Sequence, residues 1–158
     1  MAALVGAELT LAEAGTFIKA NQHFGRVRMS TFTHTNDGAL TIADTIDLVK
    51  LPRGVKVVGG AFDFGAMGTS ATLDLGLKGT DGSGYMNAAE TAADDPDYFT
   101  ASTIDVSAAG QDTFAELAQG DQNALATIDK DCTLYATTAG AGWADTKVLK
   151  GIIFYVQN

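Results

Sequence analysis

A strict two-residue alternation of apolar and polar side chains most constrains what this chain can become. It is clearest over residues 71–78, where Ala71, Leu73, Leu75 and Leu77 share one face and alternate with Thr72, Asp74, Gly76 and Lys78. Successive side chains of a β-strand point to opposite faces, so the pattern predicts a strand with one buried face. A helical repeat of 3.6 residues would scatter these leucines around the helix.

Comparable short segments recur every 10–20 residues, separated by turns rich in glycine, asparagine and aspartate. We expect strands near residues 27–32, 40–48, 55–64, 71–78, 98–106, 128–138 and 147–157. Many short strands punctuated by turns are typical of an all-β domain, specifically a β-sandwich of the jelly-roll type. The sequence therefore predicts a jelly-roll-like β-sandwich.

Three of these segments carry more specific expectations. The second should place four apolar side chains on one face: Leu40, Ile42, Ile46 and Leu48. In the third, the apolar phase changes from Val55 and Val57 to Phe62 and Phe64, which a β-bulge at Gly59–Gly60 would explain. The last segment is apolar on both faces, which predicts a central strand or one covered by a partner.

The first 23 residues differ from the rest. Residues 8–22 have a weak helical pattern that is interrupted by Gly15, so this segment is expected to be a short helix or an extended arm. The predicted organisation is an N-terminal arm over 1–23 and a β-sandwich domain over 24–158. Two further short helical turns are expected, one over 86–93 and one opened by the capping box at 113–116.

Charge excludes several classes of function. The net charge is −9, so general nucleic-acid binding, which needs a basic surface, is not expected. Six of the ten basic residues fall between Lys19 and Lys56, whereas residues 81–131 are strongly acidic. No apolar run approaches the roughly 20 residues that cross a bilayer, and the N-terminus lacks the features of a secretion signal. The single cysteine, Cys132, allows no intrachain disulfide and suits a reducing compartment.

The sequence carries no recognisable catalytic, cofactor or metal motif. His23 and His34 have no partner motif and are expected on the surface, and Cys132 is expected to be a buried thiol. A calcium loop ending at Glu90 would place Gly79, which has no side-chain ligand, at the first coordinating position. The acidic loops are therefore expected to face water, with cation binding left open. We predict that the protein is not an enzyme.

Several segments resemble capsid decoration, or cement, proteins of tailed bacteriophages. The resemblance lies in residues 46–54 (IDLVKLPRG), Val57–Val58, residues 71–76 (ATLDLG), the acidic loop 81–97 and the closing strand 151–158, and it covers roughly residues 24–158. It implies a jelly-roll protein on the exterior of an icosahedral head, assembled in the host cytoplasm. It also implies the major capsid protein as partner, self-association as a trimer or dimer, and no cofactor.

The candidate partner-binding residues are the arm and a basic cluster: Phe17, Ile18, Phe24, Arg26, Arg28, Arg53 and Lys56. Alternatively, Phe17 and Ile18 simply cover the lower end of the sandwich. Deleting residues 1–20 is expected to abolish capsid binding without unfolding the domain.

Other functions remain open at this point. A carbohydrate-binding or adhesion module would need an exposed aromatic platform that includes Trp143. A tail or fibre subunit is a second alternative, and an enzyme with convergent acidic residues is the least favoured.

Overall fold

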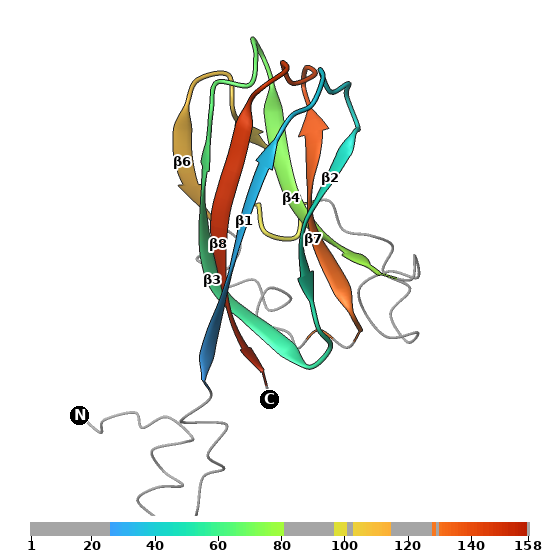
Figure 1. The fold of residues 1–158 in the computed structure, drawn as a ribbon, viewed down its shortest axis with the longest axis vertical. Coiled ribbons are helices and arrows are strands. Elements are labelled where there is room, and N and C mark those ends of the chain that lie inside the picture. Colours follow the sequence, from blue (N-terminus) through green and yellow to red (C-terminus); the bar gives the residue numbers. More distant parts are fainter. Residues whose placement is uncertain (1–25, 81–96, 101–102, 115–127, 129, 158) are drawn as a thin grey trace, which may run out of the picture.

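The protein folds into two antiparallel sheets that pack face to face (Figure 1). The computed structural model describes residues 26–80, 97–100, 103–114, 128 and 130–157. Within these ranges there are eight strands and no helix: β1 (Val27–Thr35), β2 (Thr45–Leu51), β3 (Val55–Phe64), β4 (Thr72–Gly79), β5 (Ile104–Asp105), β6 (Gly110–Thr113), β7 (Cys132–Ala139) and β8 (Val148–Gln157).

The strand pairing is nested. β1 pairs with β8, β2 with β7, β3 with β6 and β4 with β5, all antiparallel. Additional pairing of β3 with β8 and of β4 with β7 assembles the sheet orders β1-β8-β3-β6 and β2-β7-β4-β5. A long antiparallel ribbon folded over in this way is a jelly roll. The predicted all-β, jelly-roll-like sandwich is confirmed.

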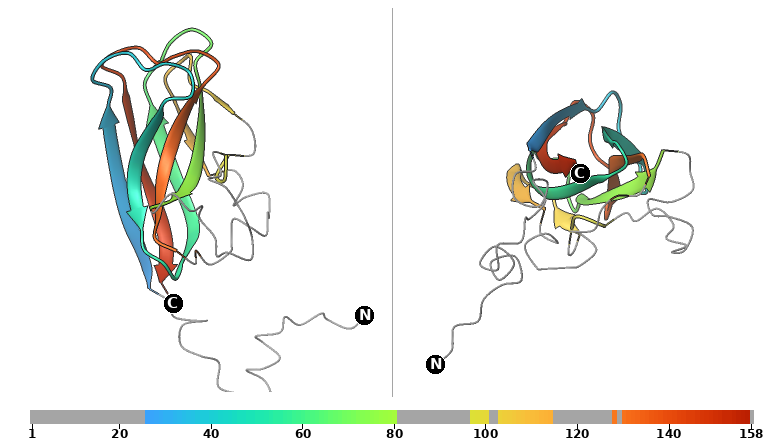
Figure 2. Two further views of the ribbon diagram at one scale, coloured as in Figure 1. Left: turned by 90° about the vertical axis from the view of Figure 1, so that its right-hand side faces the viewer. Right: turned by 90° about the horizontal axis from the view of Figure 1, so that it is seen from below.

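The core lies between the two sheets (Figure 2). Leu73, Leu75 and Leu77 of β4 are completely buried, as their alternation predicts. Aromatic rings fill one side of the core, where Phe99 stacks on Phe114 with 4.8 Å between ring centroids. The ring centroids of Phe62 and Phe114 are 6.2 Å apart. The Phe114 ring therefore connects Phe62 of β3 to Phe99 in residues 97–100. Such packing stabilises the sandwich mainly by removing large apolar surfaces from water.

The second predicted strand begins later than expected. Residues 40–44 form a turn, in which the Asp44 carboxylate accepts hydrogen bonds from the backbone N–H and hydroxyl of Thr41. Ala43 has a φ of 71°, which is incompatible with a strand, and Ile42 is 61% exposed. The prediction that Leu40 and Ile42 belong to a strand is therefore wrong, because the local turn takes precedence over the apolar pattern.

Bulges shift the phase of two strands. The β2–β7 register slips between Asp47 and Val49, so Val49 rather than Leu48 lies opposite Leu134. The β3–β8 register slips between Val57 and Gly59. The predicted phase change in β3 is thus confirmed, because Val57 and Phe62 are both buried, but the extra residue is Val58 rather than a glycine.

The segment predicted as a strand over 98–106 is shorter than expected. Residues 97–100 form a turn closed by a hydrogen bond from the Thr100 N–H to the Asp97 carbonyl, and among the described residues of this segment only Ile104–Asp105 is a strand. Thr113, the expected start of a helix, is the last residue of β6. The arm, the possible turn over 86–93 and residues 115–127 lie outside the described residues.

Candidate partner-binding surface

The four basic residues of the predicted site come from separate elements but meet at one end of the sandwich. Arg28 of β1 lies opposite Tyr155, and Lys56 of β3 lies opposite Val156, so the two residues flank the end of β8. Arg26 directly precedes β1, and Arg53 lies in the turn between β2 and β3. This is the lower end in Figure 1, where β8 finishes. We call these four residues the basic end.

The basic end carries charge that no described ion pair neutralises. Within the part of the chain that the structure describes, the two ion pairs join Lys78 to Asp47 and Lys150 to Asp63. Arg53 contributes only its backbone N–H, which donates to the Asp131 carboxylate at 2.9 Å. The side chains of Arg26, Arg28 and Arg53 are exposed. The other predicted contacts, Phe17, Ile18 and Phe24, lie outside the described residues.

The outward surface of β1, β8 and β3, which we call the β8 face, is unusually apolar. Its most exposed apolar side chains are Val27 (61%), Met29 (58%) and Val58 (42%). The outward residues of β8 between them are half-buried: Ile152, Phe154 and Val156. β8 is a central strand, as its two apolar faces predict. Exposed apolar patches of this kind mark interaction surfaces more often than isolated apolar residues do.

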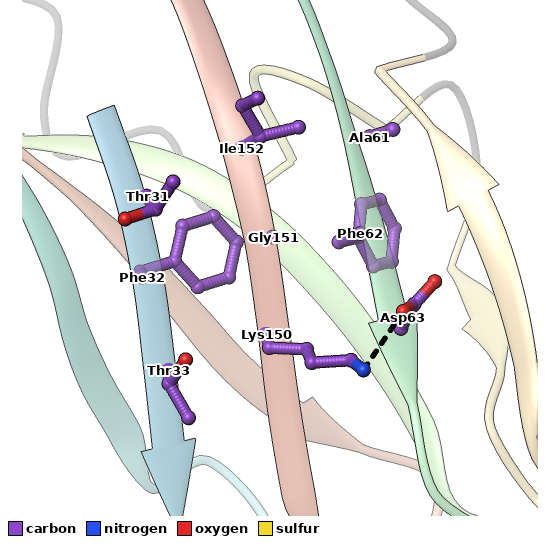
Figure 3. Close-up of a pocket in the computed structure, with 9 residues that line it drawn as sticks. All are labelled: Thr31, Phe32, Thr33, Ala61, Phe62, Asp63, Lys150, Gly151 and Ile152. Carbon is purple, nitrogen blue, oxygen red and sulfur yellow. Dashed lines mark ion pairs between the residues drawn. The ribbon is translucent and has the colours of Figure 1, made fainter. Parts of the chain in front are cut away.

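A groove of about 330 Å³ crosses the β8 face (Figure 3). Its centre is the row Phe32–Gly151–Phe62, whose residues lie opposite one another on β1, β8 and β3. Two rows of outward side chains form the walls: Thr31, Ile152 and Ala61 on one side, and Thr33, Lys150 and Asp63 on the other. The Lys150 ammonium and the Asp63 carboxylate are 3.2 Å apart at one rim. We call this feature the Gly151 groove.

Gly151 is required by this arrangement. A Cβ at this position would lie 2.5 Å from the Phe32 ring and 2.7 Å from the Ala61 carbonyl oxygen. Both approaches are far closer than van der Waals contact, and the second involves backbone that cannot move freely. The glycine therefore lets the Phe32 ring pack directly against β8.

The outward surface of the opposite sheet, which we call the β7 face, is polar and covered. Tyr135 of β7 is only 5% exposed, and the Lys78 ammonium lies 5.1 Å from the centre of its ring. Burial raises the pKa of the nearby Asp74 carboxyl above its ordinary value, against the lowering effect of a hydrogen bond with Thr103. The charge of Asp97 raises this pKa further.

The described residues do not assemble a metal centre. No group of three or more His, Cys, Asp or Glu side chains among them is arranged to hold a metal ion. Cys132 is fully buried, as predicted. His34 was expected on the surface but is half-buried, with its Nε2 atom inaccessible and without a hydrogen-bond partner. None of the described segments is a helix of the length and hydropathy needed to span a bilayer.

Trp143 does not form the exposed aromatic platform that an adhesion module would need. It is 1% exposed, and its indole N–H donates to the Thr72 carbonyl at 3.2 Å. It lies in the β7–β8 connection, whose backbone is also bonded to residues 36–44 and to Met67. Trp143 thus fastens the loops at the upper end of the sandwich.

Comparisons with known proteins identify the fold. No protein-family model and no curated protein matches the chain. Among solved structures, a chain of the capsid of Ralstonia phage GP4 is 22% identical with a TM-score of 0.64, over 85% of this chain and 86% of that one. A chain of the cyanophage Pam1 capsid is 18% identical with a TM-score of 0.53, over 92% of this chain and 96% of that one. These similarities establish a shared fold over most of each chain.

Proposed function

We propose that this protein is a structural component of a phage virion that binds the outer surface of an icosahedral head and stabilises it without catalysis. One observation carries this proposal, namely the structural similarity to a chain of the GP4 capsid over most of both chains. The match spans 85% of this chain and 86% of that chain, so it concerns the whole sandwich and not a fragment of it. The absence of a motif for catalysis in the sequence points in the same direction.

Stabilisation would follow from mass action. A protein that binds neighbouring capsid subunits only when they are assembled lowers the free energy of the assembled shell relative to separated subunits. Oligomeric copies, as trimers or dimers, would gain avidity from modest individual contacts. The basic end and the N-terminal arm are the proposed contacts with the major capsid protein. The partner surface that faces the basic end would be acidic, since none of its four cations takes part in an ion pair among the described residues.

Co-sedimentation with empty heads tests the proposal. Purified full-length protein should sediment with heads prepared without it, saturate at a fixed number of copies and raise the temperature at which heads rupture. A variant lacking residues 1–20 should lose binding while keeping the β-sheet spectrum of the intact protein. Protein that stays in the supernatant at concentrations well above those of the heads would contradict the proposal.

A tail or fibre position is distinguished by the same particles. Electron microscopy of heads carrying the added protein should place new density over the faces of the shell. Density confined to the tail would contradict the decoration role. The carbohydrate-binding alternative loses support because Trp143 is buried.

A further inference from the structure

Three buried oxygen atoms without a hydrogen-bond partner lie together on the β7 face. They are Oδ1 of Asp74 and the hydroxyl oxygens of Thr72 and Thr137, and each has almost no accessible surface. Asp74 of β4 is directly opposite Thr137 of β7, and Thr72 is two positions before Asp74, so all three side chains are on the same side of the sheet. We call these three residues the Asp74 cluster.

The spacing within the Asp74 cluster leaves room for a ligand. Side chains directly opposite one another in antiparallel strands have Cβ atoms about 4.5–5.5 Å apart. The Thr137 hydroxyl and the Asp74 carboxylate are therefore neighbours, yet Oδ1 and this hydroxyl are both without a hydrogen bond. Buried polar atoms normally have a partner, and exceptions indicate an ordered water or an ion. A small ligand between these oxygens would supply the missing partner.

A second carboxylate lies on the other side of Asp74. The Phe99 N–H donates to the Leu75 carbonyl at 2.9 Å, so residues 97–100 run beside β4. Thr103 hydrogen-bonds to the Asp74 carboxylate. Burial raises the pKa of Asp74 most, and the charge of Asp97 raises it further, which shows that the two carboxylates are close enough to repel each other.

This set of groups suits a hard cation better than a water or a transition metal. The two ion pairs among the described residues do not include Asp74, and a bound cation would offset the repulsion between the carboxylates, which a water would not. Calcium takes six to eight oxygen ligands, including carboxylates and waters. Transition metals prefer imidazole or thiolate, and the described residues hold no group of three or more His, Cys, Asp or Glu for them.

We propose that the Asp74 cluster, together with Asp97 and Thr103, binds one calcium ion. The Asp74 carboxylate and the hydroxyls of Thr72 and Thr137 contribute oxygens from the two paired strands, Asp97 supplies the second negative charge, and waters complete the coordination. The ion links β4 and β7 to residues 97–100. This site is independent of the proposed function, since it concerns the β7 face and not contact with a capsid.

Calcium titration of the full-length protein tests the site. After removal of metals with a chelator, calcium chloride at constant ionic strength should raise the melting temperature in a saturable way, by about 5–8 °C at a hundredfold excess over the dissociation constant. Isothermal calorimetry should give a site with one ion per chain. Asp74→Asn should abolish this shift, because it removes the charged ligand. Asp47→Asn, which removes an equal charge from the same face, should retain it.

A second pair of variants tests the hydroxyl ligands without altering charge. Thr137→Val removes an orphaned hydroxyl and keeps the shape of the side chain, so it should weaken calcium binding by about tenfold. Thr45→Val is the matched control, because Thr45 lies opposite Thr137 on the same face and is exposed. It should change the affinity by less than about twofold. Melting temperatures in calcium-free buffer confirm that both variants are folded.

Two outcomes would overturn the site. If calcium does not raise the melting temperature of the wild-type protein, the orphaned oxygens hold water only. If wild type and Asp74→Asn respond equally, calcium binds elsewhere in the chain. Co-sedimentation with empty heads is measured separately, so failure of the calcium site and failure of the proposed function are distinguishable.

Discussion

The outward surfaces of the two sheets are built from equally regular strands yet have opposite character. On the β7 face, a large aromatic side chain, Tyr135, is almost completely covered and lies beneath the Lys78 ammonium. On the β8 face, Met29 and Val27 are more than half exposed, and a groove opens over Gly151. The large aromatic side chain of the β7 face is thus covered within the isolated chain, whereas the β8 face leaves apolar side chains exposed to water. This difference indicates where a partner would gain most by binding.

The largest expected difference between the faces concerns stability. Tyr135→Ala should lower the free energy of unfolding by about 3 kcal/mol, because it removes a buried ring. Met29→Ala, which removes a side chain of the exposed strip, should change it by less than about 0.5 kcal/mol. Urea unfolding of both variants checks this. Similar losses in the two variants would mean that Met29 is packed and that the β8 face is not open.

An intermediate effect is expected beneath the groove. Gly151→Ala should destabilise the protein by about 1–3 kcal/mol, since its methyl group would overlap the Phe32 ring and the Ala61 carbonyl. Gly59→Ala is the matched control, because a Cβ there meets no heavy atom within 4 Å. It should change the stability by less than about 0.5 kcal/mol in thermal unfolding. A tolerated alanine at 151 would contradict the packing of Phe32 against β8.

The smallest expected effect is a pH dependence located on the β7 face. Because the folded-state pKa of Asp74 is raised mainly by burial, the folded state retains a proton that the unfolded state releases. The contribution of Asp74 to stability therefore falls as the pH rises from about 4 through its folded-state pKa, and the penalty persists at neutral pH. Asp74→Asn should be more stable than the wild type at pH 7, with the difference shrinking toward pH 4. A difference independent of pH in denaturant titrations would contradict this assignment.

The fold class could be predicted because its main signal is local. Alternation over residues 71–78 forces Leu73, Leu75 and Leu77 to one face, and no other regular structure accommodates that pattern. β6 was not predicted, because its residues, Gly110–Thr113, show no alternation of apolar and polar side chains. Its position is set by pairing with β3. The predicted start of β2 was wrong, because a turn around Asp44 interrupts the apolar alternation that begins at Leu40. This turn depends on side-chain hydrogen bonds, which the alternation does not indicate.

The candidate surface was predicted only in part. The basic end could be proposed from the density of cations before Lys56, and the structure places four of them at one end of the sandwich, with Arg28 and Lys56 on opposite faces of the sheet. The Gly151 groove could not be anticipated, since its walls combine residues 31–33, 61–63 and 150–152 from three strands. The one available signal was the apolar character of both faces of the last strand. That signal indicates a covered or central strand, but does not say what covers it.

The nested pairing of the strands has a consequence for how the protein is made. β1 can acquire its neighbour only after residues 148–157 have been synthesised, because Val27 pairs with Val156. At roughly 5–20 residues per second, the ribosome needs roughly 6–25 s to cover that separation. During this interval Phe32 and the rest of β1 have no sheet to join, and contacts this distant in sequence form slowly even afterwards. Residues 81–131 are synthesised within this interval and are strongly acidic, so their charge would help the unclosed chain to resist aggregation.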